Sequence, residues 1–374
     1  MNETPAAGRA PADTTAPFLL LGDQGERPFD AVALERELES MWKSPPGANA
    51  FYRAALANLI VPLDTEPFER LADVIADVAR RHPARLFRIG PARHAPGEPK
   101  RLTARATALC HLREGGGAFV CSEQVLLEYT EETAPLVPSA VRSLLIGDLP
   151  VVLLLLTPGP RPPWAEALAG LADIVVADSC VEEEPAAMAA VWERTGRKGA
   201  PMHDLAWARL EPWRASLASL FDTPEAAPAL RSLHDVTVVH GGAAPPSSAW
   251  LLAGWLASRL GWKVASRDGA RFRFRAPEGG TPEIAFVRDE TDPEARIREV
   301  RARAAGAHPL DARLTHEARA DDARLELLAP RALVTPIPFV RRELAAAVVG
   351  EIQRRIPNAA FRDAARAARA LLEA

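Results

Sequence analysis

Short, almost wholly apolar runs separated by helical patterns constrain the fold of this chain more than any other feature. The runs Pro150–Leu156 and Ile174–Ala177 are typical of strands that are covered on both faces of a sheet. Between them, Trp164–Leu171 has the spacing of a helix. We therefore predict an α/β fold, in which a mixed β-sheet is flanked by helices, with a C-terminal α+β domain.

Other patterns extend this arrangement towards the N-terminus. A helix is predicted at Phe29–Trp42, and a strand–helix–strand unit has its first strand ending near Pro62 and its second at Arg85–Ile89. A right-handed crossover would make these two strands parallel. Leu102–Arg113 and Phe119–Tyr129 alternate like two antiparallel strands, with the alternative that the second turns into a helix at Glu123.

The length of 374 residues suggests two domains. Residues 1–28 are predicted to be a disordered tail, because they cannot bury enough apolar surface to offset chain entropy. Residues 29–225 would form the N-terminal α/β domain and residues 226–374 the C-terminal domain. The latter should contain the apolar helix Ser248–Leu260, ended by Gly261, and strands at 236–239, 262–266, 270–275 and 284–288. The Arg/Ala/Leu-rich remainder, 293–374, is predicted to be mostly helical, with a break at Pro357.

The composition and net charge of the chain limit the classes of function to be considered. Lys and Arg number 45 against 49 Asp and Glu, a net charge of −4, so no basic field attracts nucleic acid. Three cysteines are too few for a disulfide framework and suggest a reducing compartment. No apolar run approaches the roughly 20 residues of a membrane span. We expect a cytoplasmic protein without a nucleic-acid or membrane partner. The eight histidines lack ligand spacing, so neither a metal nor a cofactor is expected.

The segment from Asp204 to Asp222 has the most suggestive side chains. Trp207, Leu210, Trp213, Leu217 and Leu220 recur along one helical face, which Asp204 could cap and Pro212 should kink or restart. One interpretation is that this face packs in the core, because aromatic stripes are usually buried. The other is that it binds a partner, because Trp and Arg contribute strongly to binding at interfaces. If the tryptophans face the core, the arginines can stay exposed and bind acidic groups. The predicted partner-binding residues are Trp207, Arg209, Trp213 and Arg214.

Two strand ends support a ligand-binding hypothesis. His240-Gly241-Gly242 lies between a strand and a helix, where helix amides can bind phosphate, but its spacing fits neither a dinucleotide fingerprint nor a P-loop. Asp178-Ser179 ends a buried strand, where open sheets place sites, although both residue types also commonly form caps and turns. No histidine is placed to activate Ser179, so no catalytic residue is predicted.

Cys110 and Cys121 lie near the ends of the two strands that we pair. If they face each other they could form a redox couple. The alternative is two buried, inert thiols, since free cysteine is among the most buried residue types.

Several blocks in series resemble the glucose-6-phosphate dehydrogenase assembly protein family (OpcA). They are Arg81–Arg85, Cys121–Gln124, Leu145–Val152, Ala172–Ser179, the Asp204–Asp222 segment and Leu252–Trp262. The resemblance runs from about residue 30 to about 262, with little to recognise in the last hundred residues. It implies a non-catalytic assembly factor that binds and allosterically activates glucose-6-phosphate dehydrogenase, the first enzyme of the oxidative pentose phosphate pathway. The alternative is a sugar-phosphate- or nucleotide-binding enzyme or sensor that uses the carboxyl edge of its sheet.

Overall fold

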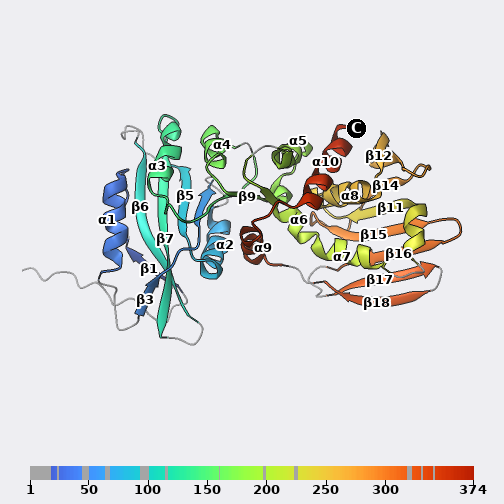
Figure 1. Ribbon diagram of the computed structural model, residues 1–374, viewed down its shortest axis with the longest axis horizontal. Coiled ribbons are helices and arrows are strands. Elements are labelled where there is room, and N and C mark those ends of the chain that lie inside the picture. The colour runs from blue at the N-terminus through green and yellow to red at the C-terminus, as the bar shows by residue number, and fades with distance from the viewer. Residues whose placement is uncertain are drawn as a thin grey trace, which may run out of the picture. The chain divides into compact units, whose positions relative to one another are not determined.

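A computed structural model gives the fold of the chain (Figure 1). The structure describes residues 18–22, 25–43, 50–63, 68–92, 101–113, 117–159, 161–196, 199–222, 226–317, 322–329, 332–339 and 342–374. They fall into two compact units. Unit 1 contains the described residues up to Thr157 together with Arg161–Val175, and unit 2 contains residues 158–160 and Val176–Ala374. The predicted boundary near residue 225 therefore falls inside unit 2.

Unit 1 is built on a mixed sheet. Its strands are β1 (Phe18–Gly22), β2 (Arg27–Pro28), β3 (Ala50–Arg53), β4 (Asn58–Pro62), β5 (Arg85–Pro91), β6 (Thr103–Leu112), β7 (Ala118–Tyr129) and β8 (Val151–Leu155). The order is β1–β6–β7–β5–β4–β8, with β2 paired to β6 and β3 to β7. β1, β6 and β7 are antiparallel neighbours, whereas β7, β5, β4 and β8 run parallel, as predicted for β4 and β5.

Helices flank this sheet. They are α1 (Ala31–Met41), α2 (Phe68–Arg81), α3 (Val137–Ser143) and α4 (Pro163–Ala169). α1 begins at Asp30, whose side chain accepts a hydrogen bond from the amide of Ala33 at 3.0 Å, and it buries Leu34 and Leu38. Figure 1 shows α1 and α2 on either side of β6 and β7. The predicted α/β fold with a mixed, helix-flanked sheet is confirmed.

Two details of unit 1 differ from the sequence prediction. The disorder predicted for residues 1–28 does not extend over β1 and β2, because Phe18–Gly22 pairs along its whole length with β6 and buries Leu21. Residues 1–17 and 23–24 lie outside the described residues. The alternative that the second strand becomes a helix at Glu123 is wrong, since β7 continues to Tyr129.

Unit 2 contains a second, eight-stranded sheet. The chain enters the unit through β9 (Ile174–Ala177) and continues through α5 (Pro185–Glu193), β10 (Met202–Asp204), α6 (Leu205–Arg209) and α7 (Glu211–Ser219). The chain then forms β11 (Leu233–His240), α8 (Ser247–Leu260), β12 (Lys263–Asp268), β13 (Arg271–Arg275) and β14 (Glu283–Arg288). It continues with the strands β15 (Ile297–Ala304), β16 (Leu310–Thr315), β17 (Asp322–Ala329) and β18 (Leu333–Pro338) and ends with the helices α9 (Leu344–Gln353) and α10 (Ala359–Glu373). The order is β12–β13–β14–β11–β15–β16–β17–β18. Only the β11–β14 pairing is parallel among the pairings described in this sheet.

The apolar helix α8 forms the centre of unit 2. Figure 1 shows α10 beside it. The two backbones approach so closely that a Cβ on Gly254 would lie 2.3 Å from the carbonyl oxygen of Ala364. On the sheet side, Trp250 contacts Phe286 edge-on, with a centroid distance of 4.8 Å. Gly261 ends the helix in the left-handed conformation (φ 66°), as predicted.

The mostly helical prediction for residues 293–374 is wrong for 297–304, 310–315, 322–329 and 333–338, which form the four antiparallel strands β15 to β18. Along β15, Val300, Ala302 and Ala304 are buried while the intervening arginines are not, so the burial repeats every two residues. Ala, Arg and Leu favour helices as isolated residues. Tertiary burial of one strand face overrides that preference here. The helix break at Pro357 is confirmed, because it lies between α9 and α10.

Candidate functional site

A buried carboxylate organises the polar residues at the start of α6. Asp204 is 1% exposed. Its Oδ1 accepts hydrogen bonds from the amides of Ser179 (3.1 Å) and Ala206 (2.9 Å), and the second of these is the predicted helix cap. Its Oδ2 accepts from Ser179 Oγ at 2.6 Å and Trp192 Nε1 at 2.9 Å. Burial raises the pKa of Asp204 to about 6. The Ser179 hydroxyl is thus a donor to a structural carboxylate.

Asp178 and Arg209 form a bidentate ion pair next to this network. Arg209 Nη1 and Nη2 donate to the two carboxylate oxygens at 2.9 and 2.7 Å. Burial opposes the charge of Arg209, but Asp178 outweighs it and raises the pKa of the guanidinium. Burial also raises the pKa of the neighbouring Cys180 to about 12, which keeps it a thiol. The Arg209 side chain remains 31% exposed, so it has surface left for a further contact.

The two tryptophans of the Asp204–Asp222 segment belong to the interior of unit 2. Trp207 packs against Phe361 and Trp213 against Phe339, with centroid distances of 5.7 and 5.1 Å. Both are buried, at 3% and 5% exposure. Arg214 lies over the Trp207 ring at 3.6 Å from its centroid. Of the four residues predicted to bind a partner, only the arginines therefore have appreciable surface, and partner contact stays a prediction.

The glycines at 241 and 242 are explained by close packing within unit 2. Their amides donate to the carbonyl oxygens of Arg296 and Asp292 at 3.0 and 2.9 Å. A Cβ on Gly241 would lie 2.3 Å from the carbonyl oxygen of Glu294. His240 is buried, with Nδ1 2.9 Å from the carbonyl oxygen of Gly241. Both glycine amides thus have protein partners, and ligand binding at this loop stays a prediction.

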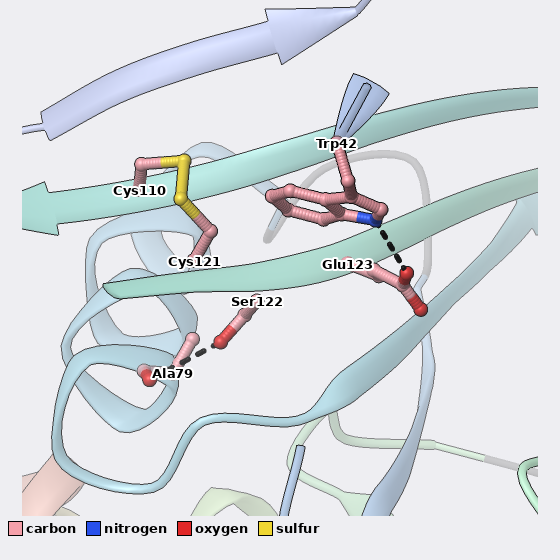
Figure 2. Close-up of a disulfide and its surroundings, with 6 residues drawn as sticks. All are labelled: Trp42, Ala79, Cys110, Cys121, Ser122 and Glu123. Carbon is pink, nitrogen blue, oxygen red and sulfur yellow. Dashed lines mark hydrogen bonds between the residues drawn. A yellow bond between two sulfur atoms is a disulfide. The ribbon is translucent and has the colours of Figure 1, made fainter. Parts of the chain in front are cut away.

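Cys110 and Cys121 face each other across β6 and β7 and are joined by a disulfide (Figure 2). Both are fully buried in a cluster with Leu21 and Phe119, against which Trp42 packs. The facing arrangement on which the redox prediction depended is present. Because the two sulfurs are bonded, the alternative of two free, inert thiols is wrong. A redox role stays a prediction.

A charged hub two residues further along β7 has no counterpart in the sequence prediction. Glu123 is 1% exposed and accepts hydrogen bonds from Arg85 Nε at 2.8 Å and, as Figure 2 shows, from Trp42 Nε1 at 3.2 Å. Arg53 also forms an ion pair with it at 2.7 Å. Arg85 in turn pairs with Glu35 and donates to the carbonyl oxygen of Leu144 at 2.6 Å. The hub links α1, β3, β5 and β7. The available signals were Arg85 at the start of a largely apolar strand and Glu123 within another strand.

The fold and these polar networks define the class of protein. In the described part of the chain, no helix is both long and apolar enough to cross a membrane, and no group of three or more His, Cys, Asp or Glu could hold a metal ion. The chain is a two-unit α/β protein whose candidate site residues are largely held in internal ion pairs and hydrogen bonds.

Two family models match the chain in succession. One, described as the glucose-6-phosphate dehydrogenase subunit N-terminal domain, covers residues 75–193, and the other, described as the C-terminal domain of that subunit, covers residues 200–365. Together they match well over half of the chain, which belongs to this glucose-6-phosphate dehydrogenase subunit (OpcA) family. The second match continues to residue 365, which corrects the expectation that little is recognisable after residue 262.

Curated relatives agree with this assignment. The chain is 32% identical over 199 residues to a protein of Nostoc punctiforme named "Putative OxPP cycle protein OpcA", covering 53% of this chain and 41% of the relative. A protein of the same name from Synechococcus elongatus is 27% identical over 217 residues, or 57% of this chain and 48% of the relative. The matches thus span less than half the length of these relatives. An oxidoreductase structure from Sinorhizobium meliloti is 12% identical, covers 85% of this chain and 89% of its own, and has a TM-score of 0.42.

Proposed function

We propose that this chain is a non-catalytic partner of glucose-6-phosphate dehydrogenase, which it binds and activates in the cytoplasm. The observation that carries the proposal is the pair of successive family matches, because both are described as domains of a subunit of that enzyme. The matches draw on both units, so the proposal concerns the chain as a whole and not one motif.

The state of the reactive side chains favours a role without bond-making. The Ser179 hydroxyl donates to the buried Asp204, and burial keeps Cys180 protonated. A serine nucleophile needs a nearby base that removes its proton. Asp204, the carboxylate bound to Ser179, already accepts four hydrogen bonds and therefore has a structural role. These residues support a rigid scaffold in preference to an active site.

Arg209 is the residue we expect to contact the dehydrogenase. Asp178 fixes its guanidinium through two hydrogen bonds, while part of the side chain remains exposed. An arginine that is already oriented loses little conformational entropy when it binds a carboxylate of a partner. Arg214 is a second, more enclosed candidate, because it lies over the Trp207 ring.

Activation requires that the chain bind the active conformation or oligomer of the dehydrogenase more tightly than the inactive one. A tenfold shift of that equilibrium takes about 1.4 kcal/mol of differential binding. An interface of standard size, roughly 1,600 Å², could supply this difference with a small part of its contacts.

The test is to mix the purified chain with the dehydrogenase of the same organism. Co-elution in size-exclusion chromatography and a rise in kcat or kcat/KM that saturates with chain concentration are expected. Heat-denatured chain is the control for non-specific protein effects. Unchanged kinetics without co-elution would refute the proposal, and so would turnover of a substrate by the chain alone. A thermal shift of the isolated chain with glucose 6-phosphate would instead support the ligand-binding alternative.

A further inference from the structure

One face of the sheet of unit 2 is covered by helices. Trp250 of α8 contacts Phe272 and Phe286 edge-on, and Leu220 at the end of α7 clusters with Ala304 of β15. Successive side chains of a strand point to opposite faces. The buried residues of β13 and β16 accordingly alternate with residues that are exposed or half-buried. These alternate residues form a second face, the open face of the sheet.

Arginines on the open face are held by carboxylates and still keep much of their surface. Arg271 and Arg273 donate to Glu283 at 2.8 and 2.7 Å, and their side chains remain 52% and 57% exposed. Arg324 lies 3.0 Å from Glu326 and is 65% exposed. A guanidinium has five N–H donors, so each of these groups can bind a further acceptor without being reoriented.

The end of the open face at β12 and β13 has an excess of positive charge. With the carboxylate that binds its arginines, this end contains four cations and two carboxylates, a net charge of +2: Lys263, Arg271, Arg273, Arg275, Asp268 and Glu283. Lys263 and Arg275 lie directly opposite each other, and in the described part of the chain neither forms an ion pair. Directly opposed like charges destabilise a sheet. An anionic partner would relieve this repulsion.

The other end of the open face, at β16 and β17, has an excess of negative charge. It contains a hollow of about 550 Å³. Two arginines and four carboxylates line the hollow: Arg313, Arg324, Glu299, Glu317, Asp322 and Glu326. When Arg301, which pairs with Glu299, is added, three arginines face four carboxylates and the net charge is −1. Among the residues that the structure describes, Glu317 and Asp322 have no ion-pair partner.

The middle of the open face carries less charge than its ends. Val287 of β14 is 46% exposed there, and Thr237 and Val239 of β11 are half-buried. Arg303 lies between Asp235 and Asp311, 3.5 Å from each, which gives this group a net charge of −1. The charges of the two ends and of the middle therefore cancel. A weakly apolar centre between polar ends is the usual composition of a protein interface.

From this polarity we propose that the open face binds the open face of a second copy of this chain. In a dimer with two-fold symmetry the same surface serves both copies. An axis that lies in the plane of contact exchanges the two ends, so that the basic end of each copy meets the acidic end of the other. Only a partner with the same polarity in reverse satisfies both ends at once, and a second copy has it by symmetry.

The size of the open face agrees with such a dimer. Eight strands about 4.8 Å apart and about six residues long give it roughly 700 Å². Each partner of a standard interface buries roughly 800 Å². The proposed dehydrogenase contacts, Arg209 and Arg214, lie on α6 and α7 and not on this sheet. The dimer therefore does not depend on the dehydrogenase contact.

Sedimentation velocity of the full chain, from about 1 to about 100 µM, tests for the dimer. We expect a monomer–dimer equilibrium whose dissociation constant rises at least tenfold between about 0.05 and about 0.5 M NaCl, because salt screens exposed charges. A chain that stays monomeric at about 100 µM in low salt would overturn the proposal. A dimer that salt does not weaken would overturn it as well.

Charge exchange tests the place. Lys263→Glu/Arg275→Glu reverses the basic end and Glu317→Lys/Asp322→Lys reverses the acidic end, without removing an ion pair seen in the described residues. Either double variant should weaken the dimer at least tenfold, because like charges then meet. All four substitutions together should restore the dissociation constant to within about threefold, because the ends are complementary again. Arg355→Glu, exposed beyond α9, is the control and should leave the dimer unchanged.

The circular dichroism of each variant is checked first, so that loss of the dimer is not confused with loss of fold. Lys263→Gln/Arg275→Gln is the milder replacement for a reversed pair that does not fold, and it should also weaken the dimer. If both reversed pairs leave the dimer intact, or if the fourfold variant does not regain it, the copies meet elsewhere and the proposal fails. If the natural chain is monomeric and the reversed variants no longer co-elute with the dehydrogenase, the open face binds that enzyme and the second copy is rejected.

Discussion

Reduction of the Cys110–Cys121 disulfide should destabilise unit 1 by a predictable amount. The bond joins directly opposed residues of β6 and β7 that are 11 positions apart in sequence. A crosslink stabilises a fold mainly by restricting the unfolded chain, and the restriction grows with the logarithm of loop length. For a loop of this size the chain-entropy relation gives about 3 kcal/mol. That is a large fraction of the roughly 5–15 kcal/mol by which domains are stable.

Urea denaturation followed by circular dichroism measures the effect. The chain is unfolded and refolded with and without a reductant, and we expect the unit 1 transition to move to lower urea on reduction. Cys110→Ala/Cys121→Ala should reproduce the reduced protein and no longer respond to reductant. Cys180→Ala is the control, since Cys180 is the cysteine outside the disulfide and its loss should leave the reductant effect intact.

Thiol counting provides an independent check. In denaturant without reductant one thiol, that of Cys180, should react, and with reductant all three cysteines should react. Because both bonded sulfurs are fully buried, reductant added to the folded chain should act slowly, at the rate of local opening. The reasoning is refuted if oxidised and reduced chains unfold at the same urea concentration, or if three thiols react before reduction.

Three further perturbations follow from the described contacts. Arg85→Met removes the buried partner of Glu123 and should cost about 3 kcal/mol in chemical denaturation, because Glu123 then keeps only the half-exposed Arg53 as a charged partner. Gly241→Ala places a methyl group 2.3 Å from a backbone oxygen and should lower the melting temperature clearly, whereas Gly147→Ala, in open space, should be near neutral. The raised pKa of Asp204, about 6 against 3.8, means that the folded chain holds this proton where the unfolded chain has released it. The contribution of Asp204 to the free energy of unfolding is therefore greatest below pH 4 and falls by about 3 kcal/mol as the pH rises through 6. Denaturation of the wild type and of Asp204→Asn at pH 4 to 7 measures this fall, because the difference between their free energies of unfolding should change with pH.

Local signals in the sequence were sufficient for much of the fold. The Asp204 cap, the restart of the helix near Pro212 and the glycine stop at Gly261 depend only on neighbouring residues, and all three are present. The antiparallel pairing of β6 and β7 follows from the alternating patterns of Leu102–Arg113 and Phe119–Tyr129, and it brings Cys110 opposite Cys121. Such features need no knowledge of tertiary structure.

Long-range features could not be predicted in the same way. The Arg85–Glu123 pair joins residues 38 positions apart, and nothing near either residue indicates the other. The strands β15 and β16 are rich in Arg, Ala and Leu, which favour helices, and the burial of one strand face is what distinguishes them from helices. The same limit applies to a cavity of unit 2, whose lining residues, among them Cys180, Trp213, Ser248, Arg296, His316 and Phe339, come from segments far apart in the sequence.

The reactive groups that the sequence offered are mostly bonded to one another, and this has a consequence for function. Ser179 is bound to Asp204, Asp178 to Arg209, and the amide of Gly241 to a backbone carbonyl. Fully satisfied buried networks hold their elements in one arrangement. A protein that stabilises one state of a partner needs a surface that is already ordered. If the surface became ordered only on binding, the cost of ordering would weaken binding to both states of the partner and would not favour either one. If the chain activates the dehydrogenase as proposed, substitutions within the networks should lower that activation in proportion to lost stability. Arg209 belongs both to a network and to the proposed contact, so Arg209→Gln should lower activation by more than its loss of stability alone accounts for.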